Sequence, residues 1–347
     1  MKRGNYSGQL TAKAAFRSGK KLELEQYIKG KRTVFITTKN TDYIRNDQEI
    51  KLLRASAAEV KVIGSLNKSY FWRILKIYAE ILVTNFRKYD TVFIGFAPQA
   101  VLPFLRFKFR KNVIIEDFFI SFFDTLCCDR KKFKEDSLAG KLLMALDRRT
   151  LQLGDVVICD TKAHGRYFTE GLGCDPEKLR VLYLNADDSI YYPRPERKRN
   201  PGDPVQVLYF GSILPLQGVG VIMQAAALLK DRKDIHFEII GPLPEKYRTD
   251  ADNVTYHSWL TQNELAEHIA ASDLCLAGHF AGDIEKAKRT IPGKAYIYEA
   301  MGKPMILGEN AANRERYTEG KDIRFVKMGD PAALAEAIVK ACDEIRI

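Results

Sequence analysis

The 347-residue sequence has few cysteines, few histidines and no long apolar run free of glycine and proline. Its six cysteines are scattered and form no CxxC pair, which favours reduced thiols in a cytoplasm over a disulfide framework or a zinc site. The longest uncharged run, Pro204–Leu229, is interrupted by Gly211, Pro215 and Gly218, so we expect a strand, a loop and a helix there instead of a membrane span. The first 21 residues contain no apolar segment typical of a secretory signal.

The histidines show no metal-binding pattern. They stand at positions 164, 236, 257, 268 and 279, without the spacing typical of metal ligands. Most are expected to be ordinary surface or core residues. The sequence therefore predicts no metal site and no bound cofactor.

Charge is divided unevenly along the chain. Residues 1–200 contain 38 Lys and Arg against 23 Asp and Glu, whereas residues 201–347 contain 17 against 21. A basic half suggests a polyanionic partner, either nucleic acid or an anionic membrane surface, unless the charge only keeps the protein in solution. Nucleic-acid binding leaves the second half unexplained, so a nucleic-acid partner is not expected.

Two series of short strands, each alternating with helices, predict an α/β protein with two domains. The proline-rich and basic segment Tyr191–Pro204 interrupts the alternation, so we expect domains at residues 1–195 and 196–347. Strands are expected at Thr33–Thr37, Glu59–Ile63, Thr91–Gly95, Val113–Glu116, Val156–Cys159, Leu179–Leu184, Val205–Phe210, His236–Ile240, Val254–Tyr256, Leu274–Ala277, Met305–Leu307 and Ile323–Val326. Helices are expected at Ser69–Lys88, Ser137–Gln152, Thr161–Glu170, Gln217–Leu229, Gln262–Ala270, Lys294–Met301 and Pro331–Glu344.

The segment Val207–Gly218, VLYFGSILPLQG, is a candidate phosphate-binding loop. An apolar strand leads into Gly211-Ser212 and then through a loop to a helix. Glycines let backbone N–H groups approach a ligand, and a helix N-terminus attracts phosphate. Because such junctions occur throughout α/β proteins, an ordinary structural turn is an equally good interpretation.

A second segment, Gly278–Pro304, concentrates basic residues around a helix start. Lys286, Lys288, Arg289 and Lys294 lie close together in the sequence, and Ile291-Pro292-Gly293 places Lys294 in the first helical turn. Cations there oppose the helix dipole, and a bound diphosphate would use both the dipole and the cations. A charged face exposed to solvent is the alternative.

The two segments together resemble the donor-binding domain of the family 4 glycosyltransferases. The resemblance continues through HFEIIG, NVTYHSWLTQNEL and ASDLCLAG, and KAKRTIPGKAYIYEAMGKPMI is similar to the branch that reads KAxRxIPxKxY. The N-terminal half adds LDRRTLQLGDVVICDTKAHGRYF and LYLNADDSIYYP. This family implies the GT-B fold, in which two Rossmann-like domains with doubly wound parallel sheets face a central cleft.

The resemblance also implies an activity. It implies a retaining, metal-independent transfer of a sugar from a nucleotide diphosphate donor, which we expect to be UDP- or GDP-linked. We expect the acceptor to be a glycan or a lipid-linked molecule at the cytoplasmic face of the membrane. The donor is expected on the C-terminal domain and the acceptor on the N-terminal one. By this resemblance Gly211 and Ser212 approach the diphosphate. Lys286, Arg289 and Lys294 neutralise the charge that it gains as the leaving group.

Several positions depart from the family pattern. Ser212 and Gln217 stand where many members have Arg and Lys. The glutamate that holds the donor ribose falls on Ile297, and the nearest carboxylate, Glu299, is two residues further on. Two residues turn a helix by about 200°, so Glu299 is a candidate donor ligand only if the local register slips. Otherwise ribose binding differs or donor binding is impaired.

Two further residues are candidates for contact with the donor sugar. Asp117 follows the expected strand Val113–Glu116, where many family members have a histidine, and it is the candidate catalytic residue. A helix cap or a structural carboxylate is the alternative for this position. His279 lies in the second loop and is a candidate contact for the sugar or a phosphate.

The first half contains two candidate membrane-surface segments. Ser69–Tyr89 presents one apolar face at helical spacing, which consists of Phe71, Ile74, Leu75, Tyr78, Leu82 and Phe86. We expect this stripe to pack on the sheet, with contact to a membrane surface as the alternative. Val101–Asn112, VLPFLRFKFRKN, mixes aromatic and basic residues and is the better candidate for attachment to an anionic membrane.

Three functions compete on these observations. The first is a cytoplasmic glycosyltransferase, peripheral at the inner membrane face. The second is a degenerate GT-B protein that serves as a non-catalytic partner or scaffold of an active transferase, which the changes at Ser212, Gln217 and Ile297 favour. The third, a nucleotide-sugar epimerase, would need paired carboxylates and a histidine that the sequence does not reveal.

Overall fold

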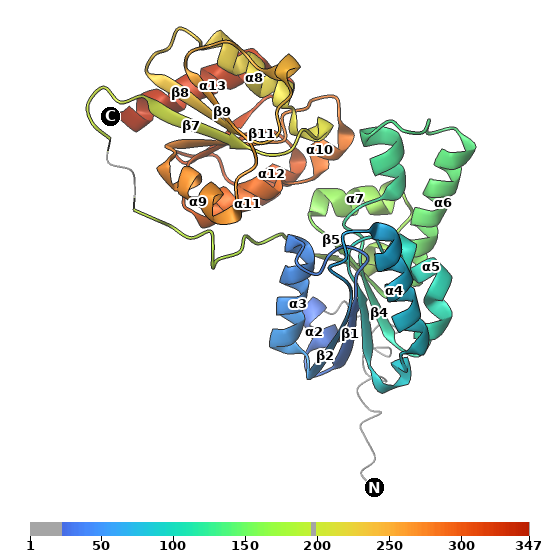
Figure 1. The fold of residues 1–347 in the computed structure, drawn as a ribbon. Coiled ribbons are helices and arrows are strands. Elements are labelled where there is room, and N and C mark those ends of the chain that lie inside the picture. The colour runs from blue at the N-terminus through green and yellow to red at the C-terminus, as the bar shows by residue number, and fades with distance from the viewer. Residues whose placement is uncertain (1–22, 196–198, 347) are drawn as a thin grey trace. The chain divides into compact units, whose positions relative to one another are not determined.

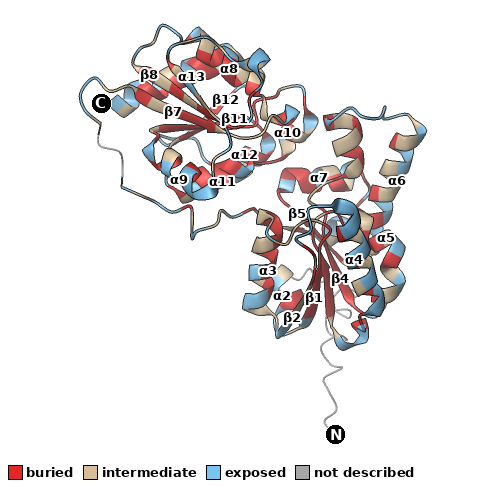
Figure 2. Cartoon of the chain, in the orientation of Figure 1, coloured by how far each residue is buried: buried red, intermediate tan, exposed pale blue. Residues whose placement is uncertain are grey.

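The computed structural model describes residues 23–195 and 199–346, so the expectation of no secretory signal in the first 21 residues falls outside the described residues. The chain forms two compact units, residues 1–183 and 184–347 (Figure 1). Each unit contains one six-stranded sheet whose neighbouring strands pair in parallel. Strands are largely buried, and their helices expose one side to solvent (Figure 2). The expected α/β class with two Rossmann-like sheets is confirmed.

The first unit has the strand order β2-β1-β3-β4-β5-β6. All six strands lie where the sequence predicts them, although β6 ends at Val181 and not at Leu184. The strands are β1 Arg32–Ile36, β2 Glu59–Ile63, β3 Thr91–Ile94, β4 Val113–Asp117, β5 Val156–Cys159 and β6 Leu179–Val181. The helices are α2 Leu24–Ile28, α3 Ile44–Ser56, α4 Tyr70–Val83, α5 Leu102–Leu105, α6 Leu138–Leu153 and α7 Lys162–Glu170.

The second unit has the strand order β12-β11-β10-β7-β8-β9. Its six strands again match the predicted ones, within one residue at each end. The strands are β7 Val205–Phe210, β8 Ile235–Ile240, β9 Val254–His257, β10 Leu274–Gly278, β11 Met305–Gly308 and β12 Ile323–Val326. The helices are α8 Val219–Leu228, α9 Gln262–Ala271, α10 Glu285–Arg289, α11 Gly293–Ala300, α12 Ala311–Arg316 and α13 Pro331–Arg346.

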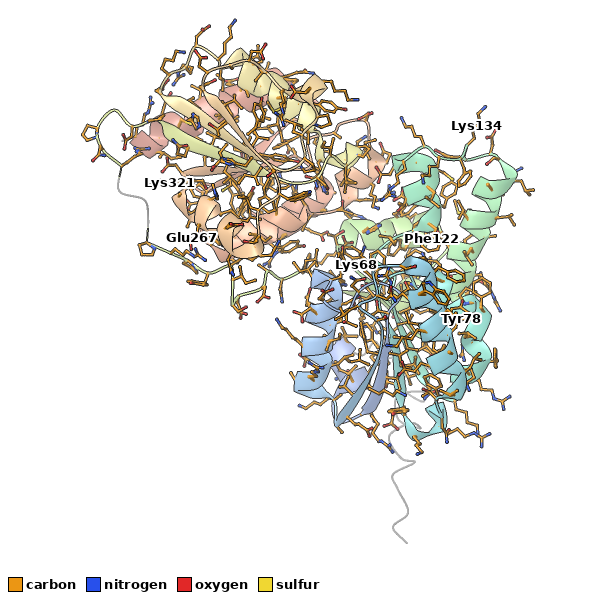
Figure 3. All side chains as sticks on the ribbon, in the orientation of Figure 1. Lys68, Tyr78, Phe122, Lys134, Glu267 and Lys321 are labelled. Atoms are coloured by element: carbon orange, nitrogen blue, oxygen red, sulfur yellow. The ribbon has the colours of Figure 1, made fainter. Side chains whose placement is uncertain are left out.

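The boundary between the units lies between Tyr183 and Leu184, ahead of the boundary expected at 195/196. The intervening segment belongs to the second unit because its side chains bond there. The Tyr191 hydroxyl donates to Gln262 Oε1 at 2.6 Å, and Arg194 pairs with Glu267, which Figure 3 labels. Proline-rich composition alone could not reveal these contacts.

Helix α4 corrects one expectation. The face that packs in the core contains Arg73, Ile77 and Ile81. Of the expected packing stripe, Phe86 is buried and Tyr78 packs against the core in part, whereas Phe71 and Leu75 remain 68% and 51% exposed. The helix thus has two apolar stripes, and the one that packs on the sheet contains the β-branched residues Ile77 and Ile81. Burial of Arg73 is compensated because Nη1 donates to Asn67 O at 2.9 Å. An aromatic face is therefore left on the surface.

Candidate functional site

The candidate site lies in the second unit, where its strand order reverses. β8 and β9 follow β7 on one side, whereas β10 returns to the other side of β7. In parallel α/β sheets, ligands bind outside the carboxyl ends of the strands at such a switch point. The loops after β7 and β10 are the two segments that the sequence singles out. The fold thus brings Gly211 and His279 to the same edge of the sheet.

The two loops are in direct contact. The backbone N–H of Phe280 donates to Gln217 O at 3.2 Å. Gly218 has φ +67°, and a Cβ there would lie 2.5 Å from Ala281 N and 2.6 Å from Phe280 C. Only glycine permits both this backbone conformation and this approach. The loop glycine before α8 therefore holds the two segments together.

Lys294 is the central residue of this arrangement. It lies in the first turn of α11 and is buried, and its Nζ hydrogen-bonds Gln217 Oε1. The ammonium also lies 4.7 Å from the centre of the Tyr209 ring. Burial lowers the pKa of Lys294 to about 7. Within residues 23–195 and 199–346, no carboxylate forms an ion pair with it, so its charge is not neutralised by the protein.

Gly211 and Gln217 complete the surroundings of this ammonium. A Cβ at Gly211 would lie 3.3 Å from Lys294 Nζ and 2.9 Å from Gln217 Oε1. The Tyr209 hydroxyl donates to the same Gln217 oxygen at 2.8 Å. In the sequence, Gln217 stands out only as a missing lysine, and Tyr209 has no predicted role. The strand periodicity that turns Tyr209 into the core was the available signal.

The remaining predicted cations lie on α10. Lys286 and Arg289 are partly buried there, and α10 contacts both the turn Pro215–Gln217 and α12. Lys288 differs, because it is exposed and bonds Glu285 Oε1. Ser212, half-buried, directly follows Gly211 in the first loop. Four predicted residues, Gly211, Ser212, Lys286 and Arg289, therefore lie on the segments that surround Lys294.

Two other predicted residues, His279 and Glu299, have partners other than Lys294. His279 is buried, with Nδ1 3.4 Å from Thr290 Oγ1, so it supports the loop from inside. Glu299 is exposed and bonds Arg316 Nη2 at 3.0 Å and the Tyr317 hydroxyl at 3.2 Å. It follows Lys294 by five residues in one regular helix, a rotation of about 140°. Glu299 therefore lies on a different side of α11 from Lys294.

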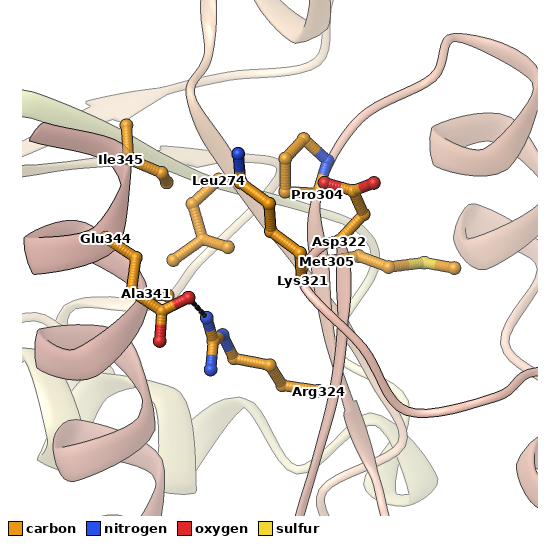
Figure 4. A pocket seen from close by; sticks show the side chains of 9 residues that line it. All are labelled: Leu274, Pro304, Met305, Lys321, Asp322, Arg324, Ala341, Glu344 and Ile345. Carbon is orange, nitrogen blue, oxygen red and sulfur yellow. Dashed lines mark hydrogen bonds and ion pairs between the residues drawn. The ribbon is translucent and has the colours of Figure 1, made fainter. Parts of the chain in front are cut away.

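Two hollows in this unit differ in size and place. One of about 660 Å³ borders the start of α8 and is lined by residues that include Leu214, Pro215, Gly218, Val219, Ala281 and Gly282. The other, of about 40 Å³, lies where β10 and β11 begin, beside the ion pair of Arg324 and Glu344 (Figure 4). The first is the larger of the two, and the two loops line it only in part, together with α8 and residues such as Tyr247 and Met328; Gly211 and Lys294 are not among its lining residues.

The structure corrects the expectation for Asp117. It ends β4 as predicted, but its carboxylate is fully buried and accepts from Arg45 Nε at 2.9 Å and Nη2 at 3.1 Å. Arg45 also lies 3.3 Å from Glu49, whose pKa burial raises well above its usual range. A carboxylate held in this way is not open to a bound sugar. Arg45 and Glu49 escaped notice because the sequence of α3 shows little amphipathic pattern.

No helix among the described residues combines the length and apolar character needed to cross a bilayer.

The chain is similar in sequence to known glycosyltransferases. Residues 204–344 match the family described as Glycosyl transferases group 1. D-inositol 3-phosphate glycosyltransferase of Thermomonospora curvata is 24% identical over 221 residues, 55% of this chain and 50% of that protein. MMP alpha-(1->4)-mannosyltransferase of Mycolicibacterium hassiacum is 25% identical over 182 residues, 49% of this chain and 41% of that protein. The chain spans about half the length of the curated relatives it matches.

Among solved structures, the Anabaena protein HepE in complex with UDP has a TM-score of 0.60 and 14% identity, and the match covers 90% of each chain. HepE has also been solved with UDP-glucose, with a TM-score of 0.58. This likeness covers both units and shows the GT-B type of fold. The family match covers the second unit, which contains Gly211 and Lys294.

Proposed function

We propose that this chain is a retaining, metal-independent glycosyltransferase of the KAxRxIPxKxY branch. It moves a sugar from a UDP- or GDP-linked donor to a glycan or lipid-linked acceptor at the cytoplasmic face of the membrane. The observation that supports this best is Lys294, a buried ammonium at the switch point of the second sheet that pairs with no carboxylate of the described residues. The family match over residues 204–344 and the UDP bound to HepE agree with it.

The chemistry of the proposed site follows from its charges. Transfer breaks the bond between the anomeric carbon and the diphosphate while the acceptor hydroxyl oxygen bonds that carbon, and the hydroxyl proton passes to the leaving diphosphate. Negative charge therefore builds up on the diphosphate in the transition state. Fixed cations stabilise it more there than in the ground state. In the proposal, Lys294, Lys286 and Arg289 supply these cations, and no metal is assigned.

Other residues have supporting roles in the proposal. Gly211 and Ser212 let the diphosphate approach the backbone, and Gln217 holds the Lys294 ammonium towards it. His279 supports the second loop from within. Asp117 is a positioning residue that holds Arg45, which in turn donates to Leu182 O at 2.6 Å. Glu299 is left out of the donor contacts.

A degenerate, non-catalytic GT-B protein is the second candidate. It is favoured because Ile297, at the family's ribose-binding position, is buried in the core and offers no hydrogen bond. Such a protein would bind a partner transferase without turning over a donor. Donor binding followed by product formation separates the two functions.

The donor is tested by unfolding the full chain in the presence of UDP, GDP and their sugar conjugates. A nucleoside diphosphate at about 100 times its Kd stabilises the protein by about 2.7 kcal/mol, so we expect the matching nucleotide to raise the Tm by several degrees. Nucleoside monophosphate is the control, because it lacks the second phosphate. If no nucleotide shifts the Tm, the donor assignment is wrong. A shift without release of free nucleoside diphosphate during incubation with acceptor lipids favours the non-catalytic candidate.

The proposed membrane face lies on the first unit. Phe71, Trp72 and Leu75 on α4 are more than half exposed, as are Phe104 and Phe107 beyond it. The two regions adjoin, because Lys108 Nζ donates to Leu82 O at 2.7 Å and the Tyr78 hydroxyl, labelled in Figure 3, donates to Ala100 O. An aromatic surface with basic residues around it is typical of attachment to an anionic interface. This face unites both candidate membrane segments of the sequence.

Vesicle flotation tests this attachment. We expect the protein to float with anionic vesicles at low salt and to be released at high salt, since charge attraction is screened over about 10 Å at 0.1 M. Serine at Phe71 and Phe107 should reduce recovery several-fold. Leu228→Ser is the control, because Leu228 is 62% exposed on α8 of the other unit. Equal recovery with neutral and anionic vesicles would contradict the charge attraction, and equal loss in all variants would contradict the assigned face.

A further inference from the structure

Three side chains that are far apart in the sequence meet on one face of the second sheet. Glu238 Oε1 lies 2.7 Å from His268 Nδ1 and 2.9 Å from His257 Nε2. One ligand atom from each residue lies within 4.8 Å of the other two. The imidazole rings are 5.1 Å apart, edge to face. None of the three residues belongs to the proposed donor site.

Strand register and helix position explain why they meet. In the pairing of β8 with β9, Glu238 stands opposite Thr255, and Ile240 stands opposite His257. Paired residues point to the same face of a sheet, and so do residues two apart on one strand. Glu238 and His257 therefore share a face. This face is the one that α9 covers, since the opposite face packs against α8 and α13. His268 lies in the last turn of α9. Three elements thus contribute one side chain each.

The three side chains have the chemistry of a metal site. Two imidazole nitrogens and one carboxylate oxygen form a donor set that Zn²⁺ accepts, with a fourth position open to water. The side chains are 31%, 32% and 17% exposed for His257, His268 and Glu238, so an ion can reach them. Among the described residues Glu238 pairs with no Lys or Arg, and its charge is available to a cation.

We propose that His257 Nε2, His268 Nδ1 and Glu238 Oε1 bind a divalent transition-metal ion of the zinc class. The ion would join the end of α9 to the end of β9, next to the bond from Gly241 N to His257 O, and so stabilise the carboxyl edge of this sheet. A nearby histidine does not take part. His236 precedes Glu238 by two residues on the same strand face, and its Nε2 lies 3.0 Å from Thr255 Oγ1.

The test is calorimetric titration of ZnCl₂ into the full chain, freed of metal with a chelator and carrying no histidine tag. We expect one Zn²⁺ per chain, and a rise in Tm when it binds. The double variant His257→Ala/His268→Ala should lose at least about tenfold in affinity together with the rise in Tm. His236→Ala is the matched control and should retain both. Co²⁺ should show the intense visible absorption of a four-coordinate site in the wild type only.

Glu238→Gln separates ligand loss from misfolding. The amide keeps the shape and a hydrogen-bonding oxygen, so this variant should have nearly the wild-type Tm without metal but bind Zn²⁺ more weakly. Equal Zn²⁺ affinity in the wild type and the double histidine variant would overturn the proposal. So would the absence of heat of binding in a wild-type chain that unfolds cooperatively.

Discussion

Replacing Lys294 by Met is expected to weaken the binding of a nucleoside diphosphate at least about tenfold and, without ligand, to stabilise the protein. Binding falls because one charge-assisted hydrogen bond contributes about 1.5–3 kcal/mol. Stability rises because a buried ammonium, which pairs with no carboxylate in the part of the chain that the structure describes, is replaced by an apolar chain of similar length, a change of about 1 kcal/mol or more. Titration calorimetry with the nucleotide that stabilises the wild type and denaturant unfolding measure the two effects. A residue that served only to stabilise the fold would give the opposite sign in unfolding.

The gain in stability should depend on pH. The pKa of Lys294 is about 7 in the folded protein, below its ordinary value of 10.5. Between these values the unfolded chain binds more protons, so the stability of the wild type rises with pH across this window. Below about pH 7, Lys294 is charged in both the folded and the unfolded protein, so the wild type bears the full free-energy cost of burying the charge. The Met variant should therefore exceed the wild type more at about pH 6 than at about pH 9.

Folding lowers the pKa of Lys294, whereas binding of a diphosphate should raise it again. A bound diphosphate favours the charged ammonium, so binding above about pH 7 should take up a proton at Lys294. Calorimetry in two buffers of different ionisation enthalpy reveals this uptake, and the Met variant should lack it. Lys288→Met is the control, since Lys288 is exposed and paired with Glu285. The same uptake in wild type and Lys294→Met would show that another group binds the proton.

The second large effect concerns the first unit. Arg45→Met is expected to lower the free energy of unfolding by about 3–5 kcal/mol, because it leaves the buried Asp117 carboxylate without its cation. Denaturant unfolding measures this loss. Arg32→Met is the matched control, because its ion pair with Glu59 is about half exposed and should contribute at most about 1 kcal/mol. If both variants lost a similar free energy of unfolding, the buried ion pair would contribute no more to stability than an exposed one.

Much of the fold was predictable from local sequence. Strands such as Val205–Phe210 and Val156–Cys159 are short apolar runs between loop residues, and burial of parallel strands on both faces requires this pattern. The two candidate loops were recognisable because Gly218 and the pair Pro292-Gly293 mark abrupt changes of backbone direction. The proximity of Gly211 and Lys294, far apart in the chain, followed only from the resemblance to a family.

Other features depended on tertiary structure. Helix α4 has two apolar stripes, and only packing against the sheet decided that Ile77 is buried and Phe71 exposed. The sequence makes Asp117 a catalytic candidate and gives Arg45 no role, because it does not show that the two will share a buried ion pair.

The sequence by itself determined the strands, helices such as α6 and α13, and the basic residues near the second loop, since these depend on neighbours within a few positions. Only the tertiary structure decided which of those charges are buried, that Gln217 hydrogen-bonds Lys294, and that Glu238, His257 and His268 meet. The reason is physical: strand order, register and the face that a helix covers arise from contacts between distant residues. These contacts set the burial and the partners on which the chemistry of each side chain depends.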